Sequence, residues 1–285
     1  MNRLDNLSQE VRVSTEIEEP TALVGDPTFS ERESEADGFR IRMLEAGDGQ
    51  PVVYLHGGGG LHVSAGLGLL ARRFHIHAFE LPGFGRSPEN VRSQSLDELA
   101  TTMSRAINNA GLDTFTLLGT SLGASLALRL ALASPERVEA LILESPAAFR
   151  PEDSRPFEMT HEQLHAALYA HPEKAPAADP PEVIAKQVAL LGRLMGPSHD
   201  VALEERMRGF ALSTLVLFGT RDGLISPRMG RIYKELMPNC SLVLVYDAAH
   251  EIQFDRPEAY ATVVGDFIER QEAFVVNADP GLIAP

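Results

Sequence analysis

The chain is poor in cysteine, tryptophan and positive charge. Its 285 residues include one cysteine, Cys240, and no tryptophan. A single cysteine cannot form a disulfide within the chain, so the sequence does not point to an oxidising compartment. Asp and Glu number 40 against 25 Lys and Arg, which gives a formal net charge of −15. Because binding to nucleic-acid phosphates draws on clustered positive charge, this balance argues against a nucleic-acid partner.

Long apolar runs are also missing. No stretch reaches the ~18 consecutive apolar residues from which a membrane-spanning helix is inferred, so we expect no membrane span. The first residues lack an apolar run behind positive charge, so we expect no signal peptide and a cytoplasmic location. The chain is nevertheless 44% hydrophobic. That content suffices for the packed core of one large domain with an insertion, or of two small domains.

A serine turn joins a predicted buried strand to a predicted buried helix. Residues 114–118 are apolar and β-branched, and residues 124–133 are almost wholly apolar. Between them lies the sequence Gly119-Thr120-Ser121-Leu122-Gly123. The two glycines let neighbouring backbones approach a sharp strand-to-helix turn closely. The free N–H groups at the helix start favour negative charge near Ser121, so the turn predicts a nucleophilic serine.

Apolar strands alternate with helices along most of the chain. A hairpin is predicted around Asp37-Gly38, and further strands are predicted at 51–55, 74–79, 138–143, 214–218 and 242–246. Helices are predicted at 95–110, 227–237 and 257–270. Such alternation is typical of an α/β fold in which a mostly parallel sheet carries helices on both faces.

The alternation breaks in one proline-punctuated segment that contains no predicted strand. This segment, residues 150–210, is expected to form a small helical cap over the carboxyl edge of the sheet, where open α/β sheets bind ligands. An acidic N-terminal extension is predicted at 1–28 and a C-terminal tail at 273–285. Between them the core has two parts, at 29–149 and 211–272, on either side of the cap at 150–210.

A serine hydroxyl needs a base to take its proton, and an imidazole base needs a carboxylate to orient it. Asp222 follows the strand predicted at 214–218 and precedes a helix, and His250 follows the last predicted strand. The chain order is therefore Ser121, Asp222, His250, with the cap between serine and acid. Glu144, at the end of the strand after the nucleophile helix, is a rival for the acid, and we favour Asp222 because of its tight loop.

The motifs together resemble those of the α/β-hydrolases that act on small molecules, from about residue 30 to about residue 270. The resemblance is carried by His56-Gly57-Gly58, Leu81-Pro82-Gly83-Phe84-Gly85-Arg86-Ser87, Gly119-Thr120-Ser121-Leu122-Gly123, Gly219-Thr220-Arg221-Asp222 and His250. It implies a serine nucleophile, no cofactor and a small-molecule substrate. It also implies an oxyanion hole made by the backbone N–H groups of Leu122 and Gly58, with Gly59 as the alternative to Gly58.

A competing pattern is His161-Glu162-Gln163-Leu164-His165, which matches the H-E-x-x-H sequence of zinc proteases. His171 stands where an extended form of that pattern places its third ligand, but it lies about 240° around the helix, and Leu168 occupies the position where the pattern needs glycine. We therefore expect no metal site. His75 and His77, which share one face of a strand, are expected to be packing or edge residues.

The serine nucleophile predicts acyl transfer to water from a small, apolar ester, thioester or lactone. The nearest alternative is hydrolysis of a C–C bond in a dicarbonyl-type substrate. Relatives with that activity usually carry Asn before the serine and Trp near the histidine, whereas this chain has Thr120 and no Trp. A third hypothesis is a non-catalytic ligand-binding receptor that keeps the fold. The sequence determines neither the substrate nor the oligomeric state.

Overall fold

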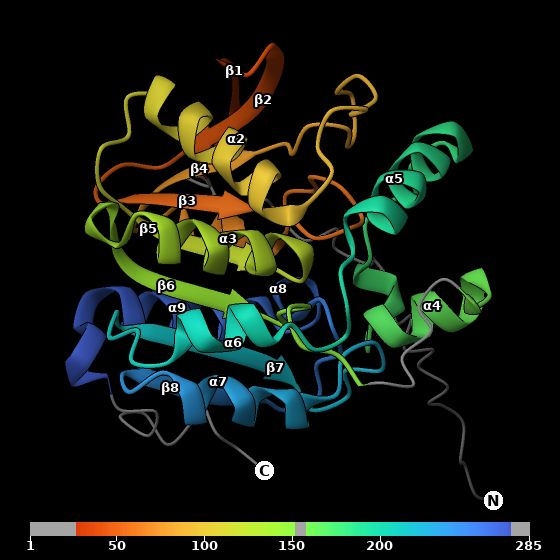
Figure 1. The fold of residues 1–285 in the computed structure, drawn as a ribbon. Helices are drawn as coiled ribbons and strands as arrows, with labels where there is room; N and C mark the ends of the chain where they lie inside the picture. The colour runs from red at the N-terminus through yellow and green to blue at the C-terminus, as the bar shows by residue number, and fades with distance from the viewer. Residues whose placement is uncertain (1–26, 152–157, 275–285) are drawn as a thin grey trace, which may run out of the picture.

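A computed structural model describes residues 27–151 and 158–274 of the chain (Figure 1). Expectations for residues 1–26, 152–157 and 275–285 lie outside this range. The described strands form one sheet in the order β1-β2-β4-β3-β5-β6-β7-β8. Their bounds are β1 (Ser30–Ala36), β2 (Phe39–Ala46), β3 (Pro51–Leu55), β4 (His75–Phe79), β5 (Phe115–Thr120), β6 (Val138–Glu144), β7 (Thr214–Gly219) and β8 (Cys240–Val245).

The sheet is mostly parallel. Strand β2 pairs antiparallel with both β1 and β4, and every other pair in the sheet is parallel. Parallel neighbours such as Leu55 and Gly119, or Gly119 and Leu143, lie side by side in register. The carboxyl ends of β3, β5 and β6 therefore meet at one edge. The predicted mostly parallel sheet is confirmed.

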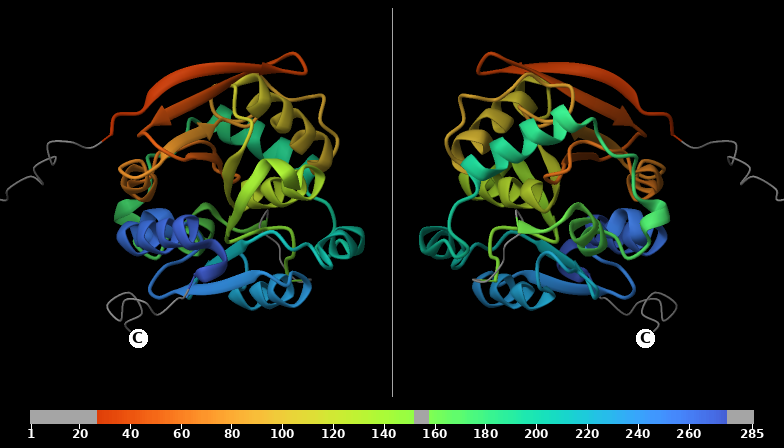
Figure 2. Two further views of the ribbon diagram at one scale, coloured as in Figure 1. Left: turned by 90° about the vertical axis from the view of Figure 1, so that its left-hand side faces the viewer. Right: turned by 90° about the vertical axis from the view of Figure 1, so that its right-hand side faces the viewer.

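Helices cover both faces of the sheet (Figures 1 and 2). One face carries α2 (Leu96–Asn109), α3 (Leu122–Ala133), α6 (Val201–Met207) and α7 (Gly230–Leu236). The opposite face carries α1 (Ala65–Leu70), α8 (Ile252–Asp255) and α9 (Pro257–Arg270). Short 3₁₀ turns are η1 (Pro135–Arg137), η3 (Pro172–Lys174), η4 (Pro227–Met229) and η5 (Gln271–Ala273). Among the described residues, no helix is both long and apolar enough to cross a membrane.

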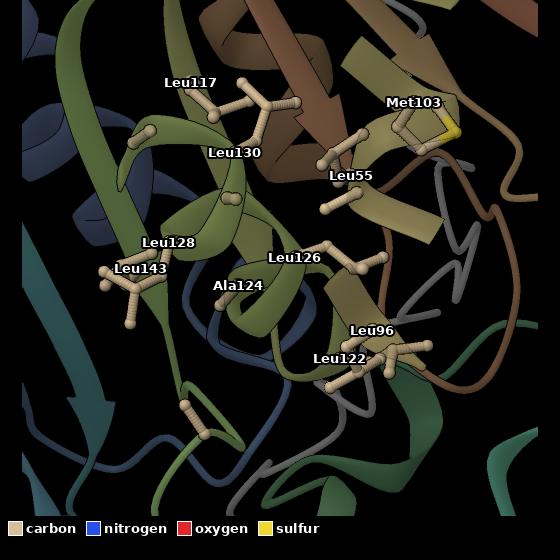
Figure 3. Packing of buried hydrophobic residues seen from close by; sticks show 14 of the residues in the cluster. Leu55, Leu96, Met103, Leu117, Leu122, Ala124, Leu126, Leu128, Leu130 and Leu143 are labelled. Atoms are coloured by element: carbon tan, nitrogen blue, oxygen red, sulfur yellow. The ribbon is translucent and has the colours of Figure 1, made fainter. Parts of the chain in front are cut away.

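Alternate side chains of each strand enter the two cores, as the period of two requires. In β3, Val53 and Leu55 join the core under α2 and α3, while Val52 and Tyr54 join the core under α1 and α9. Helix α3 is buried along nearly all of its length, and its leucines pack against α2 and the sheet (Figure 3). This packing fixes the position of the helix N-terminus.

Two helices lie beyond the carboxyl ends of the parallel strands. These are α4 (His161–Leu168) and α5 (Pro181–Leu194), which lie to the right of the sheet in Figure 1, the side toward which the parallel strands point. The described residues between β6 and β7 form no strand. Helix α6 returns to the face of the sheet, where Leu203 and Met207 are buried in the core.

Candidate active site

Ser121 lies at a strained turn between β5 and α3. Its backbone has φ 53° and ψ −109°, a left-handed conformation that costs free energy for a residue with a side chain. A Cβ at Gly123 would collide with the carbonyl oxygen of Leu55, and a Cβ at Gly119 would collide with that of Gly123. Glycine at these two positions therefore allows the helix N-terminus to pack directly against the end of β3. The hydroxyl of Ser121 is presented at the carboxyl edge of the sheet.

The structure brings the predicted acid and the predicted base together. Asp222, in the loop after β7, and His250, in the loop after β8, are both buried, and Asp222 Oδ2 lies 2.9 Å from His250 Nδ1. The other carboxylate oxygen, Oδ1, accepts hydrogen bonds from the backbone N–H groups of Leu224 and Ile225 at 2.9 and 2.8 Å. The loop thus fixes one oxygen of Asp222 and leaves the second for the imidazole.

Glu144, the rival acid, has other partners. Its Oε2 accepts a hydrogen bond from Thr120 Oγ1 at 2.6 Å, and its Oε1 accepts one from the backbone N–H of Gln253 at 3.0 Å. Burial, followed by the charge of Glu251, raises the pKa of Glu144 to about 8. Glu144 is therefore mostly neutral at pH 7, and it lies in a buried hydrogen-bond network beneath the serine turn.

The turn after β6 connects the serine to the histidine. Ser145, which has φ 44°, donates a hydrogen bond from its hydroxyl to the carbonyl of His250 at 2.9 Å. Two residues later, the N–H of Ala147 donates to the carbonyl of Ser121 at 3.2 Å. His250 Nε2 is buried and has no hydrogen-bond partner among the described residues. The described residues show no hydrogen bond between this nitrogen and the Ser121 hydroxyl, and such contacts are often long without substrate.

The electrostatics of His250 combine two opposing effects. Burial alone would lower the pKa of the imidazole, because it penalises the charged form. The charge and hydrogen bond of Asp222 outweigh burial and raise the pKa of His250 above its ordinary value, with smaller contributions from Glu251 and Glu144 in their ionised forms. Glu251, the residue after His250, also lies close to Ser121. A Cβ atom added at Gly57 would be 3.5 Å from both Glu251 Oε1 and Ser121 Cβ. Burial is also the main cause that raises the pKa of Glu251 itself.

The raised pKa of His250 predicts the acidic limb of the pH profile. A general base must be neutral, so kcat/KM is expected to fall with decreasing pH through a midpoint above the ordinary imidazole value of 6.5. Glu251→Gln removes a negative charge beside the imidazole and should move that midpoint to lower pH. Glu258→Gln, an exposed change on α9, serves as the control and should leave the profile unchanged. An identical midpoint in Glu251→Gln and wild type would contradict this account.

His56 orients the predicted oxyanion loop, a role the sequence did not reveal. Its Nε2 accepts a hydrogen bond from the backbone N–H of Leu81 at 2.9 Å, so Nδ1 carries the proton and donates to the Gly57 carbonyl at 2.7 Å. Burial lowers the pKa of His56 to about 4, which keeps the ring neutral. The loop backbone is thereby attached to the segment after β4.

The predicted oxyanion-hole residues differ in their surroundings. A Cβ added at Gly58 would contact Leu191 of α5 at 3.1 Å, whereas one added at Gly59 would have open space. Leu122 is the first residue of α3, directly after the serine.

The segment at the end of α4 is bonded to the loops that hold the acid and the base. The N–H of Gly223, next to Asp222, donates to the carbonyl of Ala167 at 3.3 Å. The N–H of Glu251, next to His250, donates to the carbonyl of Leu168 at 3.0 Å. The insertion therefore contacts both loops directly beside the residues that form the Asp222–His250 pair.

The H-E-x-x-H pattern does not assemble as a three-residue ligand cluster. The rings of His161 and His165 stack along α4 with their centroids 6.3 Å apart. His171 is directed elsewhere, and its Nε2 lies 3.0 Å from Asp247 Oδ2. Within the described residues, these side chains form no group of three donor atoms that could hold an ion.

The fold and this geometry can be compared with known proteins. A family model described as the alpha/beta hydrolase fold matches residues 50–199, more than half of the chain. The chain belongs to the α/β-hydrolase fold family. The resemblance seen in the motifs is confirmed, and the protein is an enzyme of the hydrolase class.

Curated relatives of this α/β hydrolase include enzymes that act on different bonds. The pimeloyl-[acyl-carrier protein] methyl ester esterase of Yersinia enterocolitica is 27% identical over 77% of this chain and 93% of its own length. The 2-hydroxy-6-oxo-6-(2'-aminophenyl)hexa-2,4-dienoic acid hydrolase of Metapseudomonas resinovorans is 23% identical over 86% and 93% of the two chains. A match at 31% identity to the dihydrolipoyllysine-residue acetyltransferase component of an acetoin cleaving system from Cupriavidus necator spans 41% of this chain and only 32% of that protein.

Solved structures agree on the fold. A serine hydrolase involved in carbazole degradation superposes on this α/β hydrolase with a TM-score of 0.71 at 24% sequence identity. The superposition covers 85% of this chain and 99% of the other. At this level of identity the likeness establishes the shared fold alone.

Proposed function

We propose that this α/β hydrolase cleaves a small, apolar ester, thioester or lactone through an acyl-enzyme on Ser121. The observation that carries the proposal is the 2.9 Å contact between His250 Nδ1 and Asp222 Oδ2, with His250 Nε2 buried and unpartnered near the serine turn. Leu191 of α5, which is partly exposed, lies beside Gly58. An apolar side chain next to the proposed oxyanion hole supports an apolar substrate.

The chemistry follows from the roles of the three side chains. Ser121 Oγ attacks the carbonyl carbon while His250 Nε2 takes the hydroxyl proton, and Asp222 stabilises the imidazolium that forms. Negative charge on the carbonyl oxygen is stabilised by the N–H groups of Leu122 and Gly58. His250 then donates its proton to the departing alkoxide or thiolate. A water molecule, deprotonated by His250, next attacks the acyl-enzyme, and His250 returns this proton to Ser121 Oγ as the acid product leaves.

C–C bond hydrolysis is the second candidate. It is favoured by the similarity to the Metapseudomonas resinovorans enzyme over most of both chains. Two residues speak against it, because Thr120 precedes the nucleophile and the acidic Glu251 follows the histidine. An ester hydrolase is therefore the better supported of the two.

A substrate panel separates these candidates. We expect kcat/KM on p-nitrophenyl esters of increasing acyl length to exceed that on a vinylogous 1,5-diketone acid by at least ~100-fold, a difference of about 2.7 kcal/mol in transition-state stabilisation. The esters are followed by p-nitrophenolate release and the diketone by loss of its chromophore. Faster turnover of the diketone would replace the ester proposal with C–C hydrolysis. Turnover of neither class would refute both.

A further inference from the structure

Three potential metal ligands meet on the sheet far from the serine turn. Glu45 of β2 and His77 of β4 are direct partners in the antiparallel register, so their side chains lie on the same face. His75 is two residues before His77 on the same strand and shares this face. One donor atom from each of the three residues lies within 4.8 Å of the other two. Glu45 Oε1 is 3.0 Å from His77 Nδ1, and the two imidazole rings are 4.0 Å apart.

His77 is not fully satisfied by the protein. The residue is 4% exposed, and its Nε2 is buried without a hydrogen-bond partner among the described residues. A buried imidazole nitrogen without a partner is uncommon, because its desolvation is not compensated. Turning the ring over exchanges Nδ1 with Cδ2 and Nε2 with Cε1, so the ring orientation decides which nitrogen faces the space between Glu45 and His75.

The charges of the cluster suit a divalent cation. Burial, followed by the neighbouring His75, lowers the pKa of His77, so its ring is neutral and has a lone pair available at pH 7. Arg32 Nη1 lies 3.2 Å from Glu45 Oε2, but the Arg32 side chain is 65% exposed and can withdraw into solvent. Glu45 Oε1 would remain available to an ion.

We propose that Glu45, His75 and His77 form a site for a late first-row divalent cation of the zinc type. Two imidazoles and one carboxylate are a ligand set typical of zinc, and the partial exposure of His75 leaves a fourth position for water. When the ion binds, the neutral ring of His77 keeps its single proton on the nitrogen that does not face the ion. The site lies away from the carboxyl edge of the sheet, so the ion takes no part in the proposed hydrolysis. The site attaches the β1–β2 hairpin to β4 through an ion as well as through backbone pairing.

The test is zinc binding by tag-free full-length protein freed of metal by a chelator. We expect competition with a chromogenic chelator to show one Zn²⁺ per chain with a Kd of about 10 µM or tighter. Zinc at a hundredfold excess over Kd should raise Tm by about 5 °C. His75→Gln changes the most exposed ligand. It should weaken binding at least tenfold and reduce the rise in Tm at the same zinc concentration by about half or more, with the Tm of the metal-free protein little changed.

A double variant provides the matched control. His161→Gln/His165→Gln removes the two histidines of the H-E-x-x-H pattern and should bind zinc as wild type does. Glu45→Gln should weaken binding as His75→Gln does. The proposal is overturned if wild type binds no zinc below about 100 µM. It is also overturned if His75→Gln binds as wild type does, or if the double variant alone loses the ion.

Discussion

Ser121→Ala is expected to lower kcat on the best ester substrate by about 10⁶-fold, with the fold intact. The variant removes the only atom of the proposed triad that bonds covalently to the substrate. It should also abolish labelling by a fluorophosphonate probe, which wild type should undergo rapidly. The Ser121 hydroxyl makes no hydrogen bond as a helix cap, so its removal leaves no capped N–H group unsatisfied. Tm, measured by calorimetry, should therefore stay close to that of wild type.

Ser125→Ala is the matched control for this experiment. Ser125 is buried on the same helix, and its hydroxyl donates to the carbonyl of Ser121 at 3.2 Å. The control variant should retain both labelling and turnover. Wild-type turnover by a folded Ser121→Ala protein would refute the nucleophile and, with it, the proposed mechanism.

Asp222→Asn is expected to lower kcat by about 10⁴-fold. The amide would present an N–H group to His250 Nδ1. This would hold the imidazole in the tautomer that has its proton on Nε2. In that tautomer Nε2 cannot accept the proton of Ser121. Fluorophosphonate labelling should slow by a similar factor, since the same proton transfer activates the serine.

Glu144→Gln tests the rival acid under identical conditions. Because the pKa of Glu144 is raised to about 8, the glutamine replaces a group that is already mostly neutral at pH 7. The amide oxygen can accept from the backbone N–H of Gln253, and the amide nitrogen can donate to Thr120 Oγ1, so turnover should change far less than in Asp222→Asn. A large loss in Glu144→Gln together with a small loss in Asp222→Asn would assign the acid to Glu144.

Much of the fold could be predicted from local patterns in the sequence. The strand at 51–55 and the helix at 257–270 agree with β3 and α9 because an apolar run and an N-terminal proline mark them clearly. Helix α1 (Ala65–Leu70) was not predicted, since two of its 6 residues are glycines and it shows little amphipathic pattern. The segment predicted as a helix at 227–237 begins with the 3₁₀ turn η4 and becomes α-helical only at Gly230.

The candidate site was predictable only where chemistry fixes residue type and chain order. Ser121, Asp222 and His250 follow separate strands in an order that can be read from the chain, and their roles remain a prediction. The hydrogen bonds of His56 and the effect of Glu251 on the pKa of His250 were missed, because both depend on which residues lie close together in three dimensions. The same limit applies to Glu45, whose position opposite His77 depends on a strand register that no local pattern specifies.

The strand order has a consequence for how the enzyme becomes active during synthesis. Strands β5 to β8 are neighbours in the sheet in chain order, so the residues of the serine turn are synthesised long before those of β7 and β8. A nascent chain that ends before His250 has the hydroxyl but neither the imidazole nor the neighbouring loop that Ser145 binds. Under the proposed mechanism, the unfinished polypeptide is chemically silent toward cellular esters. Reactivity toward an electrophilic probe would then distinguish finished molecules from truncated ones.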